Sequence, residues 1–95
     1  MYARVVKFKD VSRETVDNVV DEIEASGGPP EGVAATGVRM LYDAEQGTSY
    51  FVSFYDSAED MRAADAVFDA MDPHGTPGSR VSVDMCEVVM DREMD

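Results

Sequence analysis

The chain has 95 residues, enough for one domain over residues 1–95 but too few for two domains that each bury a core. Its hydrophobic fraction of 44% is typical of a globular protein and argues against disorder. The formal net charge of −12 excludes the clustered Lys and Arg side chains that a nucleic-acid surface or an anionic membrane requires.

The cysteine content and the first residues bear on where the chain is found. Cys86 is the only cysteine, so the chain has neither an internal disulfide nor a Cys-x-x-Cys motif. Residues 1–9 carry charged side chains throughout and lack the apolar region of a signal peptide. No apolar run approaches the length of a membrane span. We therefore expect a cytoplasmic protein whose partners include neither nucleic acid nor membrane.

A strand and an amphipathic helix come first along the chain. The alternation over Tyr2–Lys9 predicts a strand. Ser12 is a suitable N-cap for a helix over roughly Arg13–Ala25, and the Gly-Gly-Pro-Pro run at residues 27–30 ends that helix. Apolar side chains recur along it at the spacing of one helix face: Val16, Val19, Val20 and Ile23.

A β-hairpin over Gly37–Tyr55 is the centre of the pattern. Two β-rich runs without proline flank a polar loop at residues 44–48, in which Gly47 supplies the positive φ of a tight reversal. The second run has apolar residues on both faces: Phe51 and Tyr55 on one, and Tyr50, Val52 and Phe54 on the other. Because a half-solvated strand is polar on one face, both faces of this one are expected to be covered.

The remaining elements are a second helix and a last strand. Ser57 and Asp60 form a capping-box-like start for the helix, and Asp72–Gly78, rich in proline and glycine, predicts a loop. Arg80–Asp91 predicts the last strand. The apolar stripe of the second helix is Met61, Ala64, Val67, Phe68 and Met71.

The element order β-α-β-β-α-β predicts an α+β, ferredoxin-like fold. In this fold a four-stranded antiparallel sheet has its first and third strands in the centre and both helices on one face. The other face is then left open with apolar side chains on it, which monomers rarely tolerate over more than a few hundred Å². Burying several hundred Å² per subunit gains of order 10 kcal/mol before association costs. We therefore predict a homodimer formed through the open face.

Three segments carry a resemblance to a known family: Tyr2-Ala-Arg-Val-Val6, Leu41-Tyr-Asp-Ala-Glu-Gln-Gly47 and Phe54-Tyr-Asp-Ser-Ala-Glu-Asp60. Through them the chain resembles the antibiotic-biosynthesis-monooxygenase-like domains of the dimeric α/β-barrel superfamily. The resemblance implies a dimeric α/β barrel, and family members vary in function: some oxidise phenolic polyketides without a cofactor and some degrade haem. The haem-degrading members use an Asn, a Trp and a His. This chain has no Trp, and its only Asn, Asn18, is on the polar helix face, so that branch is excluded.

Candidate site residues fall into three groups. His74, the only histidine, is either a general base near neutral pH or a solvated loop residue. Arg4 and Arg39 lie in apolar strands, where each could bind a carboxylate or phenolate or pair with an Asp or Glu. The aromatic residues could line a pocket between sheet and helices for a planar molecule, or could serve core and dimer packing: Tyr42, Tyr50, Phe54, Tyr55 and Phe68.

Several familiar site motifs are missing from the sequence. It has no spaced ligand set for zinc or calcium, no phosphate-binding or dinucleotide glycine motif, and no nucleophile elbow. We therefore expect no metal and no cofactor. The function predicted is that of a cofactor-independent monooxygenase-like protein acting on an aromatic or polyketide-like small molecule. A non-catalytic dimeric small-molecule-binding module, and an isomerase or cyclase on the same barrel, are the alternatives.

Overall fold

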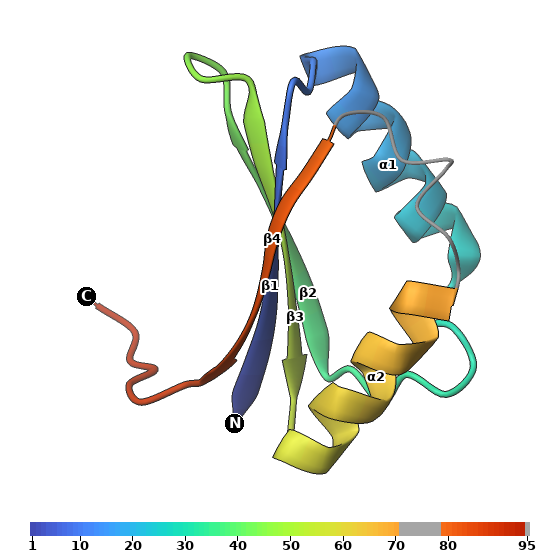
Figure 1. The fold of residues 1–95 in the computed structure, drawn as a ribbon, viewed down its shortest axis with the longest axis vertical. Coiled ribbons are helices and arrows are strands. Elements are labelled where there is room, and N and C mark those ends of the chain that lie inside the picture. The colour runs from blue at the N-terminus through green and yellow to red at the C-terminus, as the bar shows by residue number, and fades with distance from the viewer. Residues whose placement is uncertain (71–78, 95) are drawn as a thin grey trace.

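Two helices lie on one face of a four-stranded antiparallel sheet (Figure 1). The computed structural model describes residues 1–70 and 79–94. The strand order β2-β3-β1-β4 places the first and third strands in the centre, as the ferredoxin-like prediction requires. Within the described ranges, no helix has the length and apolar character needed to cross a membrane. In chain order the elements are β1 (Tyr2–Lys9), α1 (Arg13–Ser26), β2 (Gly37–Asp43), β3 (Thr48–Tyr55), α2 (Ala58–Ala70) and β4 (Ser79–Glu87).

The helix and turn signals in the sequence act as predicted. The Ser12 hydroxyl accepts a hydrogen bond from the Thr15 N–H at 3.2 Å and so caps α1. The Ser57 hydroxyl accepts from the Asp60 N–H at 3.1 Å in the same way at α2. Gly27 ends α1 in the left-handed region with φ of 75°. The structure thus confirms both helices, and α1 extends one residue beyond the predicted end.

The hairpin loop is held by Asp43. Its carboxylate accepts a hydrogen bond from the Gln46 side chain at 2.7 Å and from the backbone N–H groups of Glu45 and Gln46. These bonds, the Gln46 side chain first, lower the pKa of Asp43 below its ordinary value of 3.8. Because the folded pKa is the lower one, the contribution to stability is present above the unfolded pKa. It is lost as the pH falls through the folded value.

The face of the sheet under the helices carries the core. β1 pairs with β3 so that Arg4 is opposite Ser53, and these residues share the helix-covered face. The buried core cluster combines the end of β3, the buried side of α2 and one residue of the α1–β2 connector: Val33, Tyr55, Met61 and Ala64. The core is therefore centred on α2 rather than α1.

The opposite face has no helix over it. Its central strands carry half-buried apolar side chains, and Leu41 on β2 is 51% exposed. Lys7 on the same face lies with its Nζ 5.8 Å from the centre of the Tyr50 ring. The half-buried apolar residues are Val5, Tyr50, Val52 and Phe54. The prediction that β3 has apolar residues on both faces is confirmed.

The last strand is shorter than predicted. β4 ends at Glu87 rather than Asp91, because Glu87 is paired with Tyr2, where β1 begins. One further hydrogen bond follows, from the Val88 N–H to the Met1 carbonyl at 2.9 Å. The tail after Val88 then runs on the side of the sheet away from the helices (Figure 1), with Val89 and Met90 largely exposed.

Candidate ligand-binding site

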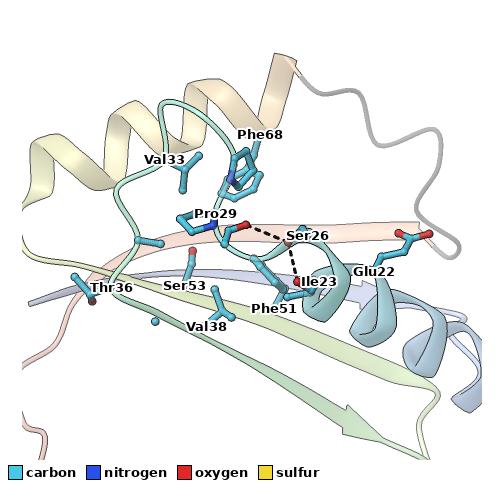
Figure 2. Close-up of a pocket in the computed structure, with 14 residues that line it drawn as sticks. Glu22, Ile23, Ser26, Pro29, Val33, Thr36, Val38, Phe51, Ser53 and Phe68 are labelled. Carbon is cyan, nitrogen blue, oxygen red and sulfur yellow. Dashed lines mark hydrogen bonds between the residues drawn. The ribbon is translucent and has the colours of Figure 1, made fainter.

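A cavity of about 630 Å³ lies between α1, the α1–β2 connector, α2 and the helix-covered face of the β2–β3 hairpin (Figure 2). This volume is within the range of about 300–1,000 Å³ typical of small-molecule sites. α1 contributes Glu22, Ile23 and Ser26, and α2 contributes Phe68. The connector contributes residues that include Pro29, Pro30 and Val33, and the hairpin contributes residues that include Val38, Phe51 and Ser53.

The cavity exists because the second half of α1 is not packed closely on the sheet. Val16 is buried, whereas Ile23, at the far end of the same apolar stripe, is only half-buried and lines the cavity. The connector cannot continue the helix after Gly27 and Pro29. It is tied back to the sheet by the Thr36 N–H, which donates to the Phe54 carbonyl at 2.8 Å. The connector therefore forms a wall rather than filling the space.

Two aromatic rings define the inner surface of the cavity. Phe51 on β3 and Phe68 on α2 meet edge to face, with ring centroids 6.2 Å apart and an interplanar angle of 76°. Both rings are half-buried and both line the cavity. Aromatic rings prefer edge-to-face or offset-stacked neighbours, so this pair offers a surface suited to a planar apolar ligand.

Behind Phe68 lies a partly buried ion pair. Arg4, only 3% exposed, donates from its Nε to Asp65 Oδ1 at 2.9 Å. The guanidinium carbon lies 4.9 Å from the centre of the Phe68 ring, within range of a cation–π interaction. Of the two roles predicted for Arg4, the structure therefore shows the ion pair. The charge supports the cavity wall from behind and does not line the cavity.

Few polar groups face the cavity. Ser53 lines the cavity but is fully buried, and its hydroxyl hydrogen-bonds the hydroxyl of the core residue Tyr55 at 2.8 Å. The Ser26 hydroxyl hydrogen-bonds the backbone carbonyls of Ile23 and Gly28, as the dashed lines in Figure 2 show. Among the described lining residues, Glu22 alone carries a charge. The site is thus apolar with one carboxylate at its end.

The sheet separates the aromatic residues that the sequence suggested for one pocket. Phe68 lines the cavity and also packs against the core cluster. Tyr42 is on the helix-covered face of the sheet, with its hydroxyl 3.5 Å from the Val11 carbonyl oxygen. Tyr50 and Phe54 face away from the helices, so the interpretation that they border the same pocket is wrong. The reason is the period of two along β3, which sends neighbouring side chains to opposite faces.

Arg39 is also on the face away from the helices. With Phe54 it lines a second groove, of about 580 Å³, beside Val88 and Met90 of the tail. A role for Arg39, Tyr42, Tyr50 or Phe54 in binding a substrate stays a prediction. His74 lies outside the described residues. Among those residues, no group of three or more His, Cys, Asp or Glu side chains could hold a metal ion.

Several lining residues were not identified from the sequence. Ile23 stands out in the sequence only as part of the apolar face of the first helix, and residues 31–36 show no helix or strand pattern. Val33 was the available signal, since an apolar residue within a run of small and polar residues has to pack against something. It is 6% exposed and belongs to the core.

A solved structure has the same fold along the whole chain. It is described as that of a "putative antibiotic biosynthesis monooxygenase" from Deinococcus radiodurans. The two are 11% identical, with a TM-score of 0.59, and the match covers 100% of this chain and 99% of the other. No protein-family model and no curated protein matches the sequence. The chain thus has the ferredoxin-like fold of this monooxygenase-like protein, as the resemblance in its sequence implies.

Proposed function

We propose that the cavity between the sheet and the helices binds an aromatic, largely apolar small molecule. The observation that carries this proposal is the cavity itself, whose volume of about 630 Å³ suits such a ligand. The rings of Phe51 and Phe68 supply the apolar contact surface. The ion pair of Arg4 and Asp65 holds Phe68 in position from behind.

We further propose that the bound molecule is oxidised by molecular oxygen without a cofactor. The likeness in fold to a protein described as a monooxygenase supports this chemistry. For a phenol the reaction balances as one phenol and one O₂ giving one quinone and one water. A non-catalytic binding module would hold the same ligand without consuming oxygen, and an isomerase or cyclase would convert it without doing so. Measuring oxygen uptake and product together separates the three.

We expect Val38→Trp to weaken the binding of 1-naphthol at least ten-fold. Val38 lines the cavity and is 46% exposed, so an indole ring at this position would occupy the ligand's space without entering the core. The dissociation constant is measured by fluorescence titration, with circular dichroism to establish that the variant is folded. Val81→Trp is the matched control, because Val81 is 50% exposed on β4 and does not line the cavity. Equal affinity of Val38→Trp and Val81→Trp for 1-naphthol would show that the ligand does not bind in the cavity.

We also propose that two copies associate through the open face of the sheet. The half-buried side chains of Val5, Val52 and Phe54 gather there, and the exposed Leu41 extends the apolar surface. This face carries charges of both signs, since Lys7 and Asp84 lie on it together. A second copy offers the same combination of apolar surface and opposite charges, as a two-fold interface requires.

We expect light scattering at micromolar concentration to give a mass near twice 10.4 kDa. Phe54→Lys places a charge on the open face, toward the end of β3, and should return the mass to that of one chain. Ala66→Lys is a suitable control, because Ala66 is exposed on α2, on the opposite side of the sheet. A mass of one chain in the unmodified protein would contradict the dimer.

A further inference from the structure

We infer that the cavity discriminates by charge, accepting neutral or positively charged aromatic molecules and disfavouring anionic ones. This inference rests on the proposed function, since it concerns the ligand class of the same site. Three features of the described residues carry it. One carboxylate lines the cavity, the C-terminal end of a helix lies beside it, and the basic side chains near the sheet are either paired or on its opposite face.

The carboxylate belongs to Glu22. Figure 2 shows Glu22 on α1 at one end of the set of lining side chains, with Thr36 toward the other end. Glu22 is exposed and therefore lies at the border of the cavity with solvent. If the ring of a ligand packs against Phe51, a substituent on the side of the ring that faces α1 would point toward Glu22. A carboxylate on the substituent would be repelled, and an ammonium group would be attracted.

The C-terminal end of α1 adds to the same field. A helix carries about half a negative charge at its C-terminus, where the last carbonyl groups lack helical partners. α1 ends at Ser26 with no basic side chain in its last turn, so no positive charge in that turn offsets the helix dipole. Ser26 and Gly28 both line the cavity, which places the helix end at the site rather than remote from it.

The basic residues near the sheet do not compensate. Arg4 is paired with Asp65 and covered by the Phe68 ring. Lys7 and Arg39 are on the opposite face of the sheet. Arg80 on β4 is paired with Asp69 of α2 at 3.2 Å and does not line the cavity. The whole chain has a net charge of −12, which reinforces a negative potential at the site. The field at the cavity is therefore negative from short and long range alike.

The test uses three probes that share one ring system and differ in charge at pH 7. They are 1-naphthylmethylamine, which is positive, 1-naphthalenemethanol, which is neutral, and 1-naphthoate, which is negative. Dissociation constants are measured by fluorescence titration at low salt, where electrostatic effects are largest. We expect 1-naphthoate to bind about five-fold or more weakly than the alcohol, and the amine to bind at least as tightly as the alcohol.

Glu22→Gln should bring the dissociation constants of the amine and of 1-naphthoate closer together, reducing the ratio of the 1-naphthoate constant to the amine constant by about three-fold. Glu24→Gln is the matched control, because it makes the same charge change on the same helix at an exposed position that does not line the cavity. It should leave the ratio nearly unchanged. The same narrowing in both variants would overturn the role of Glu22.

The possible results distinguish this inference from the proposed function, which is that the cavity binds an aromatic small molecule. Tight binding of all three probes with equal constants would overturn the charge discrimination and leave the cavity as a ligand site. Binding of none of the three would overturn the proposed function and the inference with it. Charge discrimination in the unmodified protein, together with loss of binding in Val38→Trp, would support both the proposed function and this inference.

Discussion

We expect Asp65→Ala to lower the free energy of unfolding by about 3 kcal/mol. The substitution leaves the Arg4 guanidinium buried without its partner, since Arg4 is 3% exposed and its Nε hydrogen bond goes to Asp65. The value is at the lower end of the range for broken buried pairs, because Asp65 itself is 23% exposed. Urea denaturation at one fixed protein concentration measures it, since association would make the stability depend on concentration.

Asp17→Ala is the control for this substitution. Asp17 pairs with Arg13 at 3.0 Å on α1, but both side chains are more than half exposed, at 57% and 75%. Exposed i,i+4 pairs contribute about 0.3–0.5 kcal/mol, so the loss should be small. The double substitution Arg4→Met with Asp65→Ala should recover much of the lost stability, because it also removes the unpaired charge. A loss for Asp65→Ala no larger than that for Asp17→Ala would contradict the account of the ion pair.

We expect the proposed oxidation of a phenol to depend strongly on His74. A phenol loses its proton near pKa 10, and the described lining of the cavity offers no positive charge to lower that value. A base that acts near neutral pH is therefore needed, and His74 is the only histidine in the chain. The rate of oxygen uptake should rise through roughly pH 6 to 7, where an ordinary imidazole loses its proton. His74→Ala should reduce the rate about 10²- to 10⁴-fold.

Added imidazole distinguishes a missing base from a damaged fold. If the substitution removes only the base, free imidazole in the buffer should restore part of the rate of His74→Ala, with the same dependence on pH. Binding of 1-naphthol should be unaffected in His74→Ala, which would separate the binding of the ligand from its oxidation. An unchanged rate and pH profile after the substitution would mean that His74 is not the base.

The fold could be predicted because its signals are local. Ser12, Gly27 and Gly47 each fix a boundary through hydrogen bonding or through φ, and these effects depend on few neighbours. The alternation along β1 and β3 then assigned each side chain to a face. The end of β4 was wrong by four residues, because it depends on where the partner strand begins, which the β4 sequence itself does not encode.

The site was harder to predict because it depends on gaps in the packing. Phe68 was identified from its place in an apolar stripe, but its partner Phe51 was assigned only a face. Whether a residue such as Ile23 fills a core or borders a cavity depends on the distance between α1 and the sheet. That distance is set by the connector, whose shape follows from several weak turn preferences acting together.

The two outer strands allow copies of the chain to associate edge to edge, rather than through the face of the sheet. β2 and β4 each pair with a single neighbour, so each presents a row of backbone donors and acceptors to a further strand. Such edges allow open-ended chains of sheets, whereas pairing through the sheet face stops at two copies. With twenty carboxylate side chains and eight basic ones, copies of the chain repel one another at neutral pH. Acidification toward the isoelectric point of about 4.2 brings the net charge close to zero and removes this repulsion. Near that pH the edges would become sites of filament growth.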